Sequence, residues 1–373
     1  METQADREQL MRLALRLAER GCGATSPNPM VGAVLVKGGK IIGRGWHRRA
    51  GEPHAEIEAL RDAERRGRKV KGATLYVTLE PCSSHGRTPP CTDAIRTAGI
   101  RRLITGATDP NPKHAGAGFN VLRKAGIHVT AGVLADDCNR LNEPFNHWIV
   151  HRTPFVTVKA AMTLDGKIAT ASGESKWITG EKARAYGMKL RQEADGILVG
   201  INTVLTDDPS LTARSVETSG HVENRLRRII LDSNARTPLS ARVVSDGCRG
   251  LTTIVVGTGA PSKRVAALAK KVRVLEAPLR HGRIDLKWLV KLLGKEEVTS
   301  LLVEGGGEVN ASFVLGRLAH RVAFFYAPKV LGGRGARKAV AGDGARNATE
   351  ALDLEDVEWR RLGDDLLMTA RTK

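Results

Sequence analysis

The chain has 373 residues, of which 41% are hydrophobic and 27% charged, a composition that excludes wholesale disorder and predicts two or three folded domains. Only 4% of the residues are aromatic, so extensive base-stacking surfaces for nucleic acid are not expected. Lys and Arg outnumber Asp and Glu by 59 to 40, and this net charge of +19 is spread along the chain. A dispersed positive charge favours either a soluble basic surface or attraction of a phosphorylated small molecule over nucleic-acid binding.

No apolar run approaches the roughly 18 residues that a membrane helix needs, so neither a membrane span nor a membrane partner is predicted. Near the N-terminus, Leu10, Leu13 and Leu17 recur at helical spacing among charged residues, which predicts a surface helix ending at Gly21 instead of a signal peptide. The chain is therefore expected to be cytoplasmic. Five cysteines, an odd number, favour metal binding or catalysis over a disulfide framework.

The first 150 residues alternate helix-like and strand-like stretches, which predicts one α/β domain. Strands are expected at 30–36, 41–45, 73–79, 102–106 and 127–130, and helices at 53–66, 89–98 and 118–125. A boundary near 148–154 divides the chain into expected domains 1–150 and 151–373.

The second half predicts a largely parallel sheet with crossover helices. Strands are expected at 155–160, 196–200, 228–232, 252–256 and 300–304, helices at 181–193, 286–293 and 309–318, and late strands, as a terminal hairpin, at 324–329 and 366–371.

A metal-binding pattern lies in the first half. His54-Ala55-Glu56 opens one expected helix, and Pro81-Cys82 follows an expected strand. Imidazole and thiolate suit zinc, and a site with three protein ligands leaves a position for water, whose pKa zinc lowers to about 7. Glu56 would carry protons beside that water. This His-x-Glu and Pro-Cys pattern indicates a zinc deaminase.

The spacing leaves the third ligand open. The usual signature ends Pro-Cys-x-x-Cys, whereas here His85 occupies the last position and the next cysteine is Cys91. Both His54/Cys82/His85 and His54/Cys82/Cys91 are allowed. Cys91 is favoured because the positive end of a helix dipole stabilises a thiolate in the first turn. Without a metal, His54 would be a helix-start residue and the cysteines small buried hydrophobes.

Three segments of the first half closely resemble one family: SPNPMVGA at 26–33, HAE at 54–56 and TLEPCSSHGRTPPC at 78–91. They resemble the deaminase half of the bifunctional riboflavin biosynthesis deaminase/reductases, over about residues 7–145. The resemblance implies a cytidine-deaminase-like three-layer domain. It also implies zinc on His54, Cys82 and Cys91, Glu56 as proton shuttle, pyrimidine contacts from Asn28 and His47, and a ribose-phosphate contact from Arg87.

In the second half, the apolar run at 302–303 leads to Glu304 and three glycines before an expected helix, whose bare amides suit a phosphate or pyrophosphate. A dinucleotide fingerprint is not present, and a plain turn is the alternative. With the segments at 159–167, 172–179 and 200–209, this run resembles the dihydrofolate-reductase-like reductase half of the same family, over about residues 152–371.

The reductase resemblance implies NADPH as cofactor. It implies cofactor contacts from Ala161, Trp177, Thr203, Asp207, Ser233, Gly306, Gly307, Glu308, Val309, Asn310, Ala311 and Ser312. It implies substrate contacts from Ser175, Arg191, Leu211, Arg214 and Glu304, where the two arginines chemically suit a phosphate.

The implied function is two consecutive steps of riboflavin biosynthesis. Zinc-assisted hydrolysis would remove the 2-amino group of 2,5-diamino-6-(5-phosphoribosylamino)pyrimidin-4(3H)-one. NADPH would then reduce 5-amino-6-(5-phosphoribosylamino)uracil to the ribitylamino product. The family also implies a homodimer or homotetramer.

Two other functions stay open. A nucleic-acid base deaminase agrees with the charge of +19 but not with the Cys82–Cys91 spacing, the few aromatics or the second domain. A binding protein with a structural zinc would use His85 as a fourth ligand that closes the site.

Overall fold

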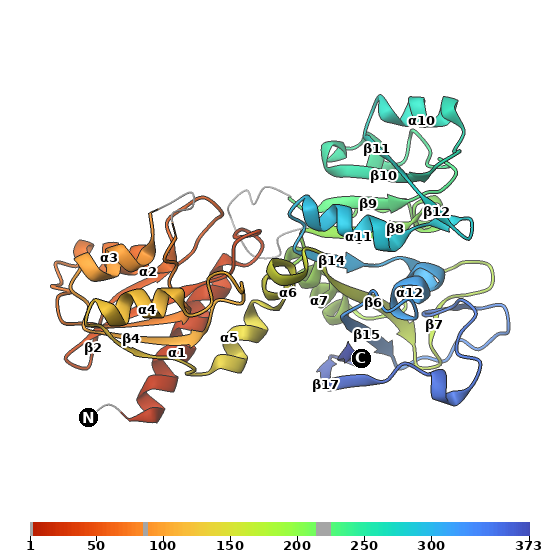
Figure 1. The fold of residues 1–373 in the computed structure, drawn as a ribbon. Coiled ribbons are helices and arrows are strands. Elements are labelled where there is room, and N and C mark those ends of the chain that lie inside the picture. Colours follow the sequence, from red (N-terminus) through yellow and green to blue (C-terminus); the bar gives the residue numbers. More distant parts are fainter. Residues whose placement is uncertain (1–2, 85–88, 214–224) are drawn as a thin grey trace. The chain divides into compact units, whose positions relative to one another are not determined.

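A computed structural model describes residues 3–84, 89–213 and 225–373 of the chain. The chain forms two compact units, an N-terminal unit Met1–Arg152 and a C-terminal unit Thr153–Lys373 (Figure 1).

The N-terminal unit has a five-stranded sheet in the order β2-β1-β3-β4-β5. Its strands are β1 (Gly32–Lys37), β2 (Lys40–Trp46), β3 (Thr74–Leu79), β4 (Arg102–Ala107) and β5 (His128–Thr130). Its helices are α1 (Gln4–Ala18), α2 (Ala55–Arg65), α3 (Cys91–Thr97), α4 (Ala117–Lys124), α5 (Ala135–Leu141) and α6 (Glu143–His151), with the 3₁₀ turn η1 (Glu19–Gly21). β1 pairs antiparallel with β2 and β3, whereas β3, β4 and β5 run parallel.

Alternation along β1 divides this unit into three layers. Ala33 and Leu35 pack in one buried cluster with α2, α3 and α4. Val34 and Val36 face the opposite side of the sheet and pack with α1 and α5. The expected three-layer α/β architecture is confirmed.

Small residues bring α2 close to the sheet. A Cβ at Gly45 of β2 would lie 2.3 Å from the backbone nitrogen of Ala59, so only glycine permits this approach. The close packing fixes the start of α2, immediately after His54, against the sheet.

The C-terminal unit has a nine-stranded sheet in the order β11-β10-β9-β8-β14-β6-β15-β18-β17. Its strands are β6 (Phe155–Thr163), β7 (Lys167–Ala169), β8 (Gly196–Gly200), β9 (Arg227–Leu231), β10 (Thr252–Gly257), β11 (Arg273–Ala277), β12 (Leu279–Arg280), β13 (Arg283–Ile284), β14 (Ser300–Val303), β15 (Arg321–Ala327), β16 (Arg337–Lys338), β17 (Leu354–Leu362) and β18 (Asp365–Thr372). Its helices are α7 (Glu181–Gln192), α8 (Ile201–Asp207), α9 (Arg242–Ser245), α10 (Ser262–Ala269), α11 (Leu286–Lys295) and α12 (Gly306–Val314), with the 3₁₀ turns η2 (Arg249–Leu251) and η3 (Ala348–Glu350).

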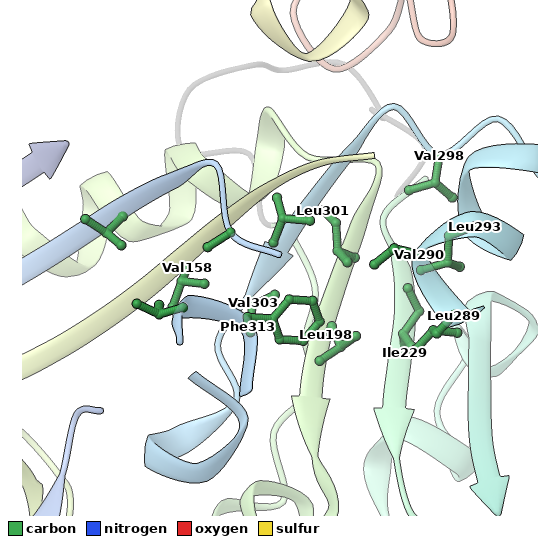
Figure 2. Close-up of a cluster of buried hydrophobic side chains, with 14 of the residues drawn as sticks. Val158, Leu198, Ile229, Leu289, Val290, Leu293, Val298, Leu301, Val303 and Phe313 are labelled. Atoms are coloured by element: carbon green, nitrogen blue, oxygen red, sulfur yellow. The ribbon is translucent and has the colours of Figure 1, made fainter. Parts of the chain in front are cut away.

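Both faces of this sheet are covered. Figure 2 shows one buried cluster, in which Leu198 of β8 and Ile229 of β9 pack with Leu289 of α11 and Phe313 of α12. The alternate residues of the same strands form a second cluster with α8, α9 and α10. The seven strands from β11 to β15 run parallel, which confirms the expected parallel sheet.

The end of the chain differs from expectation. β15 and β18 pair antiparallel, but the hairpin partner of β18 is β17, which no hydrophobic pattern predicted. β17 is exposed along most of its length and rich in charged residues, so it lacks the alternation of a half-buried strand. Within the described ranges, no helix is long and apolar enough to span a membrane.

Candidate active sites

Three ligand-type side chains meet where β3 and two helix starts approach one another in the N-terminal unit. His54 is the N-cap of α2, Cys82 follows β3, and Cys91 is the first residue of α3. His54 Nδ1 lies 3.2 Å from Cys91 Sγ and 3.7 Å from Cys82 Sγ. All three candidate ligand atoms lie within 4.8 Å of one another.

This geometry and donor chemistry fit zinc. Zn–N and Zn–S bonds of about 2.1 and 2.3 Å in a tetrahedral site place nitrogen and sulfur ligands about 3.5 Å apart. The two nitrogen–sulfur separations of 3.2 and 3.7 Å bracket that value. His85, the other candidate for the third position, lies outside the described residues, as does Arg87.

The negative charge of the two thiols is concentrated on Cys82. The pKa of Cys82 is lowered to about 4, because the Cys91 thiol, the His54 ring and the Cys91 backbone N–H all act as donors to its sulfur. The same thiol pairing, together with burial, raises the pKa of Cys91. The start of α3 thus directs its first amide to the sulfur of Cys82, whereas the sequence argument placed the benefit of the helix start on Cys91.

Glu56 lies in the first turn of α2 and is 3% exposed. Burial raises the pKa of its carboxyl group, and the neighbouring His54 opposes this rise. Its Oε2 atom is buried and has no hydrogen-bond partner among the residues that the structure describes. Because buried polar atoms are normally paired, this oxygen is available to a group outside the described residues, such as a bound water or substrate.

Asn28 and His47 form a hydrogen-bonded relay beside His54. His47 Nδ1 lies 3.1 Å from the Pro53 carbonyl oxygen, which can only accept, so Nδ1 carries the proton. His47 Nε2 therefore accepts from Asn28 Nδ2 at 3.2 Å. Burial lowers the pKa of His47, which keeps the ring neutral. Its ring stands edge-on to His54 with centroids 5.3 Å apart, so both expected pyrimidine contacts lie next to the metal-ligand cluster.

Sequence reasoning assigned no role to Glu80, which organises a loop beside Cys82. The buried carboxylate of Glu80 accepts four backbone N–H groups, from Asp109, Gly116, Gly118 and Phe119, at 2.9–3.4 Å. One side chain thus ties the segment 109–119 to the residue that precedes Pro81-Cys82. Its place directly before that dipeptide was the available sequence signal.

The reductase candidates gather at the carboxyl end of the parallel strands, where open α/β sheets bind ligands. Glu304 follows β14 and accepts both Arg191 Nε and Nη2 at 2.9 Å. Lys159 of β6 lies 3.6 Å from Glu304 Oε2. Burial alone would raise the pKa of Glu304, but the charges of Lys159 and Arg191 hold it at about 2.

This cluster limits how Arg191 can bind a phosphate, and it adds Lys159 to the candidate site residues. The bidentate pair with Glu304 occupies the Nε and Nη2 side of the Arg191 guanidinium, so a phosphate would meet mainly Nη1, which also lies 3.4 Å from the Thr212 carbonyl oxygen. Lys159 begins the segment 159–167 that carries part of the reductase resemblance, which implied no role for it. The parallel register of β6 and β14, with Val158 opposite Val303, explains why Lys159 meets Glu304.

Four of the expected cofactor contacts line one cavity of about 260 Å³: Ser233, Glu308, Val309 and Ser312. The cavity lies beside α12, which begins at Gly306, where φ is +73° and bare backbone amides are available to a phosphate. A Cβ on Gly307 would lie 2.3 Å from the Lys338 carbonyl oxygen, so the turn requires glycine there.

The remaining expected contacts have varied surroundings. Thr203 Oγ1 lies 3.9 Å from the position of a Cβ on Gly306, and Ser175 donates a hydrogen bond to Asp207 at 3.3 Å. Trp177 is exposed, with the guanidinium of Arg184 over its ring. The other four expected contacts point into the protein: Ala161 packs with the α7 cluster, Leu211 is 2% exposed in a hydrophobic cluster, Asn310 bonds the Ala339 carbonyl oxygen, and Ala311 is buried. Arg214 lies outside the described residues.

Comparison with known proteins supports both the deaminase and the reductase resemblance. Residues 4–107 match the family model of the cytidine and deoxycytidylate deaminase zinc-binding region, and residues 154–368 match that of the RibD C-terminal domain. The riboflavin biosynthesis protein RibD of Aquifex aeolicus is 45% identical over 96% of each chain.

Two solved structures cover nearly the whole chain. RibD of Acinetobacter baumannii has a TM-score of 0.87 and 34% identity over 100% of each chain. A diaminohydroxyphosphoribosylaminopyrimidine deaminase/5-amino-6-(5-phosphoribosylamino)uracil reductase of Thermotoga maritima has a TM-score of 0.82 and 34% identity over 99% of each chain. With a zinc-binding deaminase unit followed by a RibD reductase unit, the chain belongs to the RibD family of riboflavin biosynthesis deaminase/reductases.

Proposed function

We propose that the chain deaminates 2,5-diamino-6-(5-phosphoribosylamino)pyrimidin-4(3H)-one and then reduces 5-amino-6-(5-phosphoribosylamino)uracil to the ribitylamino product. The observation that carries the proposal is the His54, Cys82 and Cys91 cluster beside the buried Oε2 of Glu56, which has no hydrogen-bond partner within the described ranges. The structural-zinc alternative depends on His85, which lies outside the described residues.

In the deaminase unit, His54, Cys82 and Cys91 would hold zinc, and Glu56 would move the proton. Zinc at this position supplies an acidified water as the nucleophile for C2 of the pyrimidine. Glu56 would accept a proton from the attacking water and deliver it to the 2-amino nitrogen, which would leave as ammonia when its bond to C2 breaks. Its raised pKa suits this exchange, because a carboxyl group that titrates nearer neutral pH can both accept and donate.

Asn28, His47 and Arg87 complete the proposed deaminase contacts. The side-chain nitrogen of Asn28 faces the imidazole ring of His47. This hydrogen bond fixes the direction of the carbonyl oxygen of Asn28. That oxygen suits an N–H of the pyrimidine. Arg87 would meet the ribose phosphate.

In the reductase unit, bound NADPH would be the source of hydride for C1′ of the ribosyl group. Opening of the C1′–O4′ bond then requires a proton donor for O4′. Glu304, with a pKa of about 2, is ionised at neutral pH and cannot be the proton source. Lys159, whose ammonium group lies 3.6 Å from Glu304, is a cationic donor within the same cluster. Ser175, Arg191, Leu211 and Arg214 would place the substrate, with Leu211 acting through its backbone because its side chain is buried.

The cofactor would lie against Ala161, Trp177, Thr203, Asp207, Ser233 and the segment 306–312, with its pyrophosphate at the start of α12. The homodimeric or homotetrameric state and the cytoplasmic location belong to the same proposal. Light scattering of the purified chain and fractionation of cells test these two points.

The decisive experiment follows both steps on the purified chain and on E56Q. For wild type, we expect ammonia release from the diaminopyrimidinone phosphate and oxidation of NADPH with the deaminated product. For E56Q, we expect ammonia release to fall about a thousandfold, with zinc content and NADPH oxidation unchanged. Ammonia release that survives in E56Q, or a wild type without it, would contradict the proposal.

A further inference from the structure

The cavity beside α12 is also lined by residues that are not among the expected cofactor contacts. Leu231 at the end of β9, Ile284 of β13 and Leu286 of α11 contribute apolar surface, and Arg283 contributes a cation. Apolar walls with a few polar groups are typical of a site for a flat heterocycle. Arg283, at the mouth of such a slot, is positioned for an anion attached to that heterocycle's sugar.

Arg283 belongs to a tight hairpin whose shape is strongly constrained. β12 and β13 are joined by His281 and Gly282, with φ values of +51° and +72°, which is the left-handed pair of a two-residue hairpin turn. The hairpin is anchored by Ile284, which is buried in the core, and by Leu279, which packs where a Cβ of Gly257 would lie. The turn is therefore a rigid support for its charged residues.

The hairpin register sets two cations directly opposite each other. Arg280 pairs with Arg283, so both side chains leave the same face of the hairpin. Directly opposed like charges are destabilising on their own. Glu308 lies 3.8 Å from Arg283, but both side chains of this ion pair are mostly exposed, so it offsets little of the repulsion. A doubly charged anion between the two arginines would offset it more completely.

The strand order indicates which end of the cofactor reaches this cavity. The proposed substrate contact Glu304 follows β14, and β9 is two strands away across β8, which is about 10 Å. If the nicotinamide lies near Glu304 and the pyrophosphate at the start of α12, the rest of the cofactor would extend toward β9. The adenine would then fill the slot of Leu231, Ile284 and Val309, beside Ser233.

We propose that Arg283, supported by Arg280 across the hairpin, binds the 2′-phosphate of NADPH and so sets the preference for NADPH over NADH. This proposal rests on the reductase function proposed above and identifies a specificity residue for it. Glu308 serves as the counter-ion of Arg283 when no phosphate is present, and the phosphate replaces it.

The test measures binding to the full-length zinc-loaded protein by calorimetry, without turnover. The probes are NADP⁺ and NAD⁺, together with 2′,5′-ADP and 5′-AMP as fragments that differ by the 2′-phosphate. For R283Q, we expect the Kd for NADP⁺ and 2′,5′-ADP to rise at least tenfold, with the Kd for NAD⁺ and 5′-AMP unchanged. R280Q is expected to show a smaller change in the same direction, and R283K to recover part of the loss.

K287Q is the matched control, because Lys287 is an exposed cation on the next element that does not line the cavity. It is expected to bind all four probes like wild type. Equal losses for NADP⁺ and NAD⁺ in R283Q, or no loss for either, would overturn the assignment of Arg283. A wild type that binds neither nucleotide would instead contradict the reductase function itself.

Discussion

The candidate sites of the two units differ in how far apart their residues lie in the sequence. The deaminase candidates His54, Glu56, Cys82 and Cys91 fall within a short stretch of chain and come from two helix starts and one strand end. In the reductase unit, Lys159 of β6, Arg191 of α7 and Glu304 after β14 are far apart in sequence and are linked by ion pairs. A metal site can be predicted from a short sequence motif. A site at the edge of a sheet can be recognised only once the fold is known.

Loss of one zinc ligand should give the largest difference between the deaminase and reductase activities. For C91S, we expect zinc to fall from about one per chain to almost none and ammonia release to fall more than about a thousandfold. NADPH oxidation should be unchanged, because Cys91 belongs to the N-terminal unit. Metal content by mass spectrometry and both activity assays check this.

C138S is the matched control, because Cys138 is buried in α5 and is outside the metal-ligand cluster. It should keep its zinc. Zinc retained in C91S would instead favour His85 as the third ligand.

The converse change is E304Q in the reductase unit. We expect kcat/KM for reduction to fall about a hundredfold, since Lys159 and Arg191 lose the charge that places them. Ammonia release should stay at the wild-type level. Steady-state kinetics of both steps distinguish the two.

E296Q is the control for E304Q, because Glu296 is also paired with two arginines, Arg227 and Arg273, but is not among the reductase candidates. It should lose stability while its reductase kinetics stay unchanged. Equal reductase losses in E296Q and E304Q would mean that E304Q acts through stability alone.

A more moderate effect is expected for E80Q in the deaminase unit. An amide cannot accept all four backbone N–H groups that the Glu80 carboxylate holds, so the segment 109–119 should loosen beside Cys82. We expect KM for deamination to rise about tenfold with zinc content preserved. Hydrogen exchange of this segment, measured alongside the kinetics, should increase, and an unchanged exchange rate would contradict the role of Glu80.

The smallest effect is a pH dependence of stability that belongs to the reductase unit. The folded pKa values of Glu304 and Glu296 are both about 2, below the usual value of 4.5. Their stabilisation is therefore fully present above about pH 5 and is lost as the pH falls toward 2. Urea unfolding between pH 7 and 3 should show this decline for wild type and a shallower one for E304Q. Identical slopes for the two proteins would contradict the ionised state of Glu304.

The sequence predicted the layers and the metal cluster because both depend on local patterns. The apolar run at 30–36 and the helical stripe near the N-terminus predicted β1 of the sheet and the helix α1 that packs on it. The ligands His54, Cys82 and Cys91 follow from residue type and spacing, and the structure brings them together.

The parts that the sequence did not predict depend on non-local pairing. Lys159 meets Glu304 only through the register of β6 with β14, and Arg283 reaches the cavity only through a hairpin too short to leave a hydrophobic pattern. Glu80 resembles any polar residue before a proline until the segment 109–119 folds back over it. The exposed strand β17 was missed because charge on both faces hides its period.

The connection between β14 and α12 in the C-terminal unit is very short. β14 ends at Val303, Glu304 follows, and α12 begins at Gly306, so the proposed substrate contact and the proposed pyrophosphate seat are joined by a single residue, Gly305. The strand is central in the sheet and the helix is packed on the buried core, so neither end of this link moves independently. The backbone separation between the proposed substrate contact and the proposed pyrophosphate site is therefore set by a few covalent bonds, and motion in the surrounding surface loops should leave it unchanged.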